Sequence, residues 1–237
     1  MKKQTGNISL IVPTHNEERI VKKNLLLIYN YLNSDRFFRN FEILVCDYSK
    51  DKTPDIVKSL SKKYSRLKYI EIKYRGIGIA IRKGIESARY DAIMVYPIDM
   101  TWDKKCIKHS IMGLSSSDIV LGSRSHKDSV VTRPFKRRVF SKLYNLLINL
   151  FFGLGIKDTQ CTIALRKGDV RLFIKKLRSH DASFQIEVLI HAKKQKLKIV
   201  EIPVVVRDTR TDSKIHPLKD GLLMFRQVFK IRRELKK

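Results

Sequence analysis

Polar residues follow the first strand-like segment of the chain, in a position where they could bind an anion. The motif PTHNE (residues 13–17) comes directly after the apolar run Ile8–Pro13 and opens a segment with helical spacing over Glu17–Leu32. Free backbone N–H groups and the helix dipole favour negative charge at the start of a helix. The motif therefore predicts an anion-binding turn, and Asn16 acting only as a helix N-cap is the alternative interpretation.

A carboxylate ends the second strand-like segment. The run FEILVCD (residues 41–47) closes on Asp47, and a polar stretch then leads into a helical pattern that begins at Thr53. This places Asp47 at the carboxyl edge of a sheet, where its oxygens can accept hydrogen bonds from a nucleotide base or ribose. A simple turn, with Asp51 or Thr53 capping the next helix, is the alternative, and both roles can coexist.

Arginines follow the later segments and suit phosphate, because a planar guanidinium donates two hydrogen bonds at once. Gly122-Ser123-Arg124 comes after a short strand-like run, and Arg133 and Arg137 lie in a basic segment beyond it. Any one of them could instead lie on a solvated basic face. Arg124 is the strongest candidate because it follows a strand end directly.

Alternating strands and helices must position these residues. Strand-like runs at Ile8–Pro13, 41–47, Leu67–Tyr74, Ala92–Tyr96 and Ile119–Gly122 are separated by helical patterns at Thr53–Tyr64 and Ile77–Ala88. Further on, helical patterns at Arg137–Phe152 and Ser183–Lys194 precede a last strand-like run, KIVEIPVVV. This order predicts an α/β fold with a mostly parallel sheet flanked by helices, and ligands at the carboxyl ends of the strands.

In combination, these motifs resemble family 2 inverting glycosyltransferases of the GT-A fold. The resemblance rests on Val-Pro-Thr-x-Asn-Glu after the first strand and Asp-x-Ser-x-Asp-x-Thr after the second, and on Gly76-x-Gly78-x-Ala80-x-x-x-Gly84 and Gly-Ser-Arg later. It extends over about Ile8 to Ile215 and is strongest toward the dolichyl-phosphate mannose synthase and polyprenyl-phosphate glucosyltransferase branches. A Rossmann-like nucleotide-diphospho-sugar transferase domain is therefore expected over 1–215, with a basic amphipathic helix over 216–237.

The resemblance implies roles for particular residues. It assigns nucleotide-sugar binding to Pro13, Thr14, Asn16, Glu17, Asp47, Gly78, Asp99, Arg210 and Lys214. It assigns the acceptor phosphate to Arg124, Arg133, Arg137 and Ser141, and catalysis to Asp99, Arg124 and Arg137.

The segment after the fourth strand departs from the family pattern. Relatives carry Asp-x-Asp there to hold a divalent metal against the pyrophosphate, whereas this chain has Pro97-Ile98-Asp99. Asp99 is the remaining metal ligand, and Mg²⁺ or Mn²⁺ can bind through one or two carboxylates with donor phosphates and water. Two hypotheses stay open: an active divergent enzyme, and a degenerate homologue that binds without efficient catalysis.

The reaction that the resemblance implies is transfer of a hexose, from GDP-mannose or UDP-glucose, to a dolichyl or polyprenyl phosphate. A mannosyltransferase-like hexosyltransferase is the expected enzyme class. The lipid phosphate is already ionised near neutral pH, so no general base is needed. A soluble glycan acceptor is an alternative that would need a carboxylate base, and no carboxylate can be assigned to that role.

The composition points to anionic partners. The 50 Lys and Arg against 23 Asp and Glu give a formal charge of +27, which attracts anionic lipid, phosphorylated substrates or nucleic acid. A nucleic-acid-binding protein is the main non-enzyme alternative, although no helix-turn-helix, zinc-finger, RNP or KH signature is present. Three dispersed cysteines fit a reducing compartment.

No segment reaches the roughly 20 apolar residues that a spanning helix needs. The basic, apolar patterns at Arg137–Phe152 and Leu218–Lys237 are typical of helices at a membrane surface, and ordinary core packing is the alternative for both, above all for the second. We therefore expect a cytoplasmic protein, peripheral on the cytosolic face of a membrane. A small membrane-anchoring partner is a further expectation.

Overall fold

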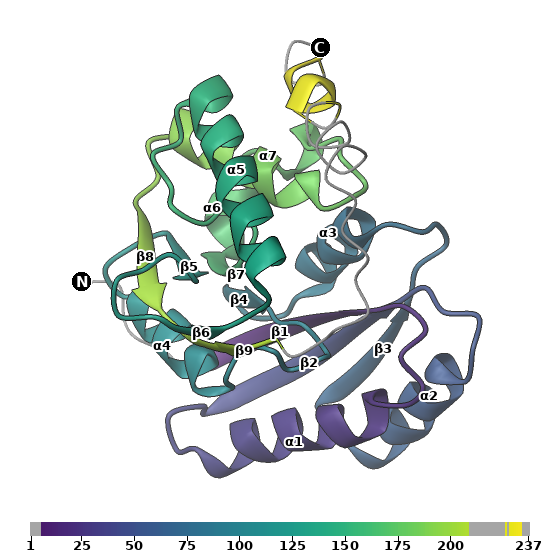
Figure 1. Cartoon of the computed structure of the whole chain (residues 1–237). Helices are drawn as coiled ribbons and strands as arrows, with labels where there is room; N and C mark the ends of the chain where they lie inside the picture. Colours follow the sequence, from purple (N-terminus) through teal and green to yellow (C-terminus); the bar gives the residue numbers. More distant parts are fainter. Residues whose placement is uncertain (1–5, 209–225, 227, 234–237) are drawn as a thin grey trace.

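The structure, a computed structural model, describes residues 6–208, 226 and 228–233. Its core is a seven-stranded sheet with the order β3-β2-β1-β4-β7-β5-β8 (Figure 1). The strands are β1 (Asn7–Thr14), β2 (Asn40–Asp47), β3 (Leu67–Glu71), β4 (Ala92–Val95), β5 (Ile119–Ser123), β7 (Thr162–Arg166) and β8 (Ile199–Pro203). All neighbours pair in parallel except β7, which runs antiparallel between β4 and β5. The expected mostly parallel α/β fold is confirmed.

Helices cover both faces of the sheet, because alternate strand residues are apolar on both sides. On β1, Leu10 and Val12 pack into the same cluster as α1 (Val21–Ser34), α2 (Thr53–Lys63) and α4 (Lys105–Gly113). On the opposite face, Ile11 packs with α3 (Ile77–Ser87), α5 (Phe135–Phe152) and α7 (Ser183–Lys194). Figure 1 shows α1 and α2 below the sheet and α3, α5 and α7 above it.

Several elements were not anticipated. They are α4, the antiparallel strand β7, the short helices α6 (Lys167–Arg171) and η1 (Ile174–Lys176), and a two-stranded sheet of β6 (Val130–Thr132) and β9 (Val205–Arg207). The last strand-like run is divided between β8 and β9, since Val204 turns from one sheet to the other. Of these additions, β7 begins at the carboxyl edge, where the candidate site lies, and the β6–β9 sheet follows the ends of β5 and β8 at the same edge.

The helix α5 follows Pro134 and ends at Gly153, which has the left-handed conformation (φ 58°) and donates its N–H to Asn149 O at 2.7 Å.

The predicted C-terminal helix lies mostly outside the described residues. Within 228–233, Val228 and Ile231 are buried in the same cluster as α5 and α7. That part of the helix therefore packs on the core, as the alternative interpretation holds. No helix within the described residues is long and apolar enough to cross a membrane.

A buried carboxylate ties three strands together at the end of the sheet opposite the site. Glu42 on β2 accepts hydrogen bonds from Ser9 Oγ on β1 (2.7 Å), from Lys68 Nζ on β3 (2.6 Å) and from the Arg89 backbone N–H (2.6 Å). Burial alone would raise the pKa of Glu42, but the bonds from Lys68, Ser9 and Arg89 outweigh it and lower that pKa. The charged form therefore stabilises the fold.

We expect Glu42→Gln to lower the free energy of unfolding at pH 7 by about 1–3 kcal/mol, because hydrogen bonds to a charged acceptor are lost. A lowered folded-state pKa gives stability that is present above the unfolded value of about 4.3 and is lost as the pH falls through the folded pKa. The difference between wild type and variant should therefore narrow in acid. Urea unfolding at several pH values measures it, and the exposed Glu86→Gln should show neither effect.

Candidate active site

A cavity of about 260 Å³ opens at the carboxyl edge of the sheet. The strands β1 and β4 end there, and the antiparallel β7 begins there, so three neighbouring strands contribute to one wall. The lining residues come from these strand ends, α3 and α7: Pro13, Glu17, Ile77, Ile81, Val95, Pro97, Ile98, Asp99, Trp102, Gln160, Cys161, Thr162 and Gln185. Three residues predicted to bind a nucleotide sugar, Pro13, Glu17 and Asp99, thus lie at one cavity.

The carboxylate of Asp99 is held in place by the turn that follows it. Its Oδ1 accepts hydrogen bonds from the backbone N–H of Thr101 (3.2 Å) and from Thr101 Oγ1 (3.0 Å). The intervening Met100 has a positive φ of 52°, which is uncommon for a residue with a side chain. The chain thus holds a strained turn that fixes Asp99 at the cavity wall, an arrangement found at functional sites.

The cavity's donor atoms fit a weakly held divalent cation. Asp99 and Glu17 are the carboxylates in its lining, whereas Pro97 supplies wall but no side-chain oxygen. Within the described residues, no group of three or more His, Cys, Asp or Glu could hold a metal ion. Mg²⁺ is commonly bound by one or two carboxylates plus substrate phosphates, so this donor set suits a cation that arrives with the donor.

Asp47 lies buried at the end of β2 with one oxygen engaged. Its Oδ1 accepts hydrogen bonds from Thr14 Oγ1 and Ser49 Oγ, both at 2.6 Å, whereas its buried Oδ2 has no hydrogen bond of normal geometry within the described residues. Burial and then the charge of Asp47 raise the pKa of the nearby Tyr69 to about 12. Tyr69 also hydrogen-bonds the Asp47 side chain, and a carboxylate oxygen can accept a second bond, so Oδ2 suits an N–H or O–H of a ligand. Thr14 orients this carboxylate.

The predicted anion site at the start of α1 is wrong. The helix begins only at Val21 and has no side-chain cap. The backbone N–H groups of Asn16, Glu17 and Glu18 are donated to the loop after β2, to Ser49 Oγ (2.8 Å), Thr53 Oγ1 (2.9 Å) and Asp51 Oδ2 (3.2 Å) respectively.

Asn16 itself, with a positive φ of 57°, uses its side-chain oxygen to accept the Lys50 N–H at 2.9 Å. It joins the two loops, so the structure gives it a role in shaping the rim and not the N-cap role of the alternative interpretation.

Gly78 on α3 is required by packing. A Cβ built there would lie 2.8 Å from both Phe184 Cβ and Ser179 O, and 2.9 Å from Asp181 O. The Gly78 N–H also donates to His180 O at 2.9 Å. The glycine therefore lets the 179–184 segment, which leads into α7, press against α3 beside the cavity.

We expect Gly78→Ala to destabilise the fold by about 1–3 kcal/mol, because backbone atoms on both sides must move. Gly168→Ala is the matched control, since its Cβ would meet only Asp91 Oδ1 at an ordinary 3.5 Å. Thermal unfolding of both variants measures the difference. Equal melting temperatures would show that α3 and the 179–184 segment are not tightly packed.

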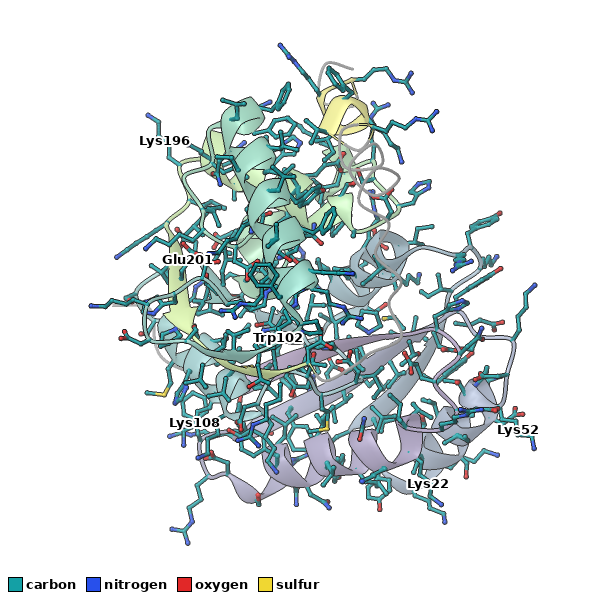
Figure 2. The ribbon with its side chains drawn as sticks, in the orientation of Figure 1. Lys22, Lys52, Trp102, Lys108, Lys196 and Glu201 are labelled. Carbon is teal, nitrogen blue, oxygen red and sulfur yellow. The ribbon has the colours of Figure 1, made fainter. Side chains whose placement is uncertain are left out.

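Arg124 lies between this cavity and a second one. Its Nε and Nη2 donate to the two carboxylate oxygens of Asp158, both at 2.7 Å, and Nη2 also donates to Gln160 O at 2.6 Å. Its guanidinium lies over the Trp102 ring, 5.6 Å from the ring centre. Burial alone would lower the pKa of Arg124, but Asp158 outweighs it and raises that pKa. Gln160 and Trp102 line the first cavity, and Trp102 is labelled near the centre of the view in Figure 2.

The second cavity, of about 330 Å³, is rich in cations. Four basic side chains line it, those of Arg124, Arg133, Arg138 and Lys142. Its lining has one carboxylate, Asp158, which is already paired with Arg124. The remaining lining residues are Ser125, His126, Ser129, Val131, Ser141 and Asn145. Three of the four residues predicted to bind the acceptor phosphate therefore share one cavity.

Arg133 shows the crowding of positive charge there. Its Nη1 donates to Ser141 Oγ at 2.9 Å. Burial, followed by the charge of Arg124, lowers the pKa of Arg133 to about 10. An anion in this cavity would relieve that repulsion.

The fourth predicted residue, Arg137, does not line the cavity. Its Nη1 donates to Asp208 Oδ2 at 2.7 Å, and Arg133 Nε lies 3.8 Å from the same oxygen. Asp208 in turn donates its N–H to Thr132 O, so this pair fixes the chain after β9 against the start of α5. Arg210 and Lys214 lie outside the described residues.

The sequence of the chain matches a known protein family. Residues 9–173 match the sequence profile of glycosyl transferase family 2. The chain belongs to this family. The match covers the strand ends that build both cavities, from Pro13 to Thr162, and the GT-A-type α/β fold agrees with it.

Several curated relatives of this family 2 chain have names that include a lipid phosphate. It is 31% identical to the dolichyl-phosphate beta-glucosyltransferase of Drosophila melanogaster, over 94% of this chain and 74% of the relative, and 30% identical to the human one, over 96% and 75%. Glycosyltransferase AglD of Haloferax volcanii is 27% identical over 94% of this chain, which spans only 36% of AglD.

Among solved structures, the chain resembles glucosyl-3-phosphoglycerate synthase of Mycobacterium tuberculosis bound to Mn²⁺, UDP and phosphoglyceric acid. The TM-score is 0.66 at 17% identity, over 94% of this chain and 76% of the other. This likeness supports the fold.

The motifs missed some residues of the family 2 chain's two cavities. Arg138 and Lys142 lie four residues apart on α5, with Ser141 and Asn145 beside them at helical spacing, and that spacing could have identified them. Trp102 carried no signal, because its place at the cavity depends on a bridge to Val206, more than a hundred residues away.

Proposed function

We propose that the protein transfers glucose from UDP-glucose to a polyprenyl phosphate of the dolichyl type. The observation that carries the proposal is the pair of neighbouring cavities, one with carboxylates at a strand edge and one with cations, joined through Arg124. A sugar nucleotide in the first and a phosphate in the second would bring donor and acceptor to opposite sides of one side chain.

The donor side of the proposal rests on Asp99, Glu17 and Asp47. Asp99 and Glu17 would hold a divalent cation, which would neutralise charge on the leaving diphosphate. Asp47 Oδ2, which has no hydrogen bond of normal geometry within the described residues, would accept a hydrogen bond from the nucleoside. Glucose is preferred over mannose because relatives at about 30% identity are named glucosyltransferases, and the mannosyl-type expectation finds no support in their names.

The acceptor side rests on Arg133, Arg138, Lys142 and Ser141. A phosphate placed among these side chains would meet several charge-assisted donors, and it needs no general base because it is already ionised. Arg124, held in place by Asp158, would fix the wall between the two cavities and add positive charge there. Alignment and charge stabilisation together would drive inverting displacement at the anomeric carbon.

The location is part of the proposal. A polyprenyl acceptor lies in a bilayer, so we propose that the protein works at the cytosolic face of a membrane, directly or through a small anchoring partner. A single catalytic unit to about residue 215, followed by a basic helix, remains our proposed division of the chain.

The test is incubation with a panel of sugar nucleotides, including UDP-glucose and GDP-mannose, in the presence of dolichyl phosphate and Mg²⁺ or Mn²⁺. Mass spectrometry of the lipid fraction should show hexosyl dolichyl phosphate with UDP-glucose. Binding of UDP-glucose without any product would favour the hypothesis of a degenerate homologue, which the replacement of the first Asp by Pro97 suggests. Salt-sensitive DNA binding without nucleotide binding would favour the nucleic-acid alternative.

A further inference from the structure

An apolar stripe runs along the exposed side of α5. Its five members are large side chains with exposed fractions from 45% to 77%, namely Phe135, Val139, Leu143, Leu146 and Leu150. Exposed apolar residues scattered singly are ordinary, but a continuous row on one helix marks an interaction surface. With a rise of 1.5 Å per residue, the row is about 22 Å long.

The stripe is opposite the face with which α5 packs on the core. At 100° per residue its five side chains cover about 80° of the helix circumference, and the buried Tyr144, Asn145 and Ile148 lie about 120–180° from the middle of the stripe. Core packing therefore explains one side of the helix and leaves the stripe unexplained. Figure 1 shows α5 as a long helix at the upper part of the molecule, beside α7.

The charges of α5 favour an anionic surface. The helix carries Lys136, Arg137, Arg138 and Lys142 and has no Asp or Glu. Lys136 lies on one flank of the stripe, and Arg138 and Lys142 lie on the other, where they also line the cation-rich cavity. A second copy docked on the same stripe would place like charges against like, whereas anionic lipid headgroups would neutralise them.

We propose that this stripe is a membrane-docking surface, which inserts into the headgroup region of an anionic bilayer. Insertion would leave the helix parallel to the bilayer, with its basic flanks among the headgroups, as interfacial helices lie. The cation-rich cavity would then open at the level of the lipid phosphates. The proposal rests on the proposed function only in making that cavity the acceptor site, because docking itself needs no catalysis.

Flotation with vesicles tests the docking surface. With vesicles of phosphatidylcholine and phosphatidylglycerol the wild type should float, and phosphatidylcholine alone or high salt should release much of it. Leu150→Gln should lower the partition coefficient about tenfold, and Leu146→Gln with Leu150→Gln about tenfold further, because Leu side chains leave the lipid. Lys136→Gln should weaken binding to the anionic vesicles alone.

Leu172→Gln is the matched control, since Leu172 is 61% exposed but follows α6 and does not belong to the stripe on α5. Flotation unchanged by the α5 variants, or reduced equally by Leu172→Gln, would overturn the proposal. Concentration-dependent dimers that Leu150→Gln abolishes, without flotation of the wild type, would assign the stripe to a second copy and also overturn it.

Failure of docking and failure of the proposed function are separable. On a short-chain, water-soluble prenyl phosphate, the double α5 variant should transfer glucose at the wild-type rate, while its transfer to dolichyl phosphate in vesicles falls. Absence of transfer by the wild type to either acceptor would contradict the proposed function and leave the flotation result standing.

Discussion

Replacing Asp99 with Asn should reduce glucose transfer to dolichyl phosphate by about 10²–10³-fold, the cost of removing one group that stabilises transition-state charge. Asn keeps the shape of the side chain and an oxygen that can accept the bonds from Thr101, so the free energy of unfolding should change little. The loss therefore belongs to the charge at the cavity. Initial rates at saturating UDP-glucose, with urea unfolding in parallel, measure both quantities.

Asp103→Asn is the control for this experiment. Asp103 lies four residues further on, is exposed, and accepts the Lys105 N–H at 2.8 Å at the start of α4, a hydrogen bond that Asn also accepts. Its activity should equal that of the wild type. If Asp99→Asn also keeps full activity with Mg²⁺ and with Mn²⁺, Asp99 does not hold the cation.

Asp158→Asn should lower the free energy of unfolding by about 3–5 kcal/mol, because it leaves the Arg124 charge buried without its partner. The two side chains are only 12% and 2% exposed, and three hydrogen bonds from Arg124 reach the Asp158 carboxylate, one from the backbone N–H and two from the guanidinium. Loss of the pair would also let Arg124 move from the wall between the two cavities, so the rate of glucose transfer should fall. Urea unfolding gives the stability, and rates below the unfolding transition give the activity.

Lys230→Gln provides the comparison, since it removes a 3.5 Å pair with Asp181 in which both side chains are more than 40% exposed. Such a pair contributes at most about 1 kcal/mol. If Asp158→Asn lowers the free energy of unfolding by a similarly small amount, Arg124 is free to turn toward a ligand. It would then have the role of binding the acceptor phosphate, which its motif first suggested.

Several regular elements could be predicted, although α4 could not, because each buried strand of the first half is a short apolar run that ends in a polar turn. The runs at 8–13 and 41–47 became β1 and β2 within a residue, and α7 has the expected bounds. The strand β7 could not be predicted in the same way. Its antiparallel place between β4 and β5 depends on pairing partners roughly 70 and 40 residues away, which no local pattern contains.

The position of a side chain could be predicted where it follows from a strand end, as for Asp99 after β4 and Asp47 at the end of β2. It was not predictable where a neighbouring loop competes for the same groups. Asn16 shows this, because the backbone N–H groups expected to bind an anion are satisfied by side chains from 49 to 53. Arg137 shows it again, because Asp208, seventy-one residues away, pairs with it.

A crystal structure of the protein with UDP-glucose and Mn²⁺ would show where the donor binds. We expect the diphosphate in the cavity between Pro13 and Gln160, with the cation on Asp99 and the nucleoside near Asp47. Nucleotide bound elsewhere, such as in the lysine-lined groove of about 740 Å³ beside β3, with the Asp99 cavity empty, would contradict this expectation.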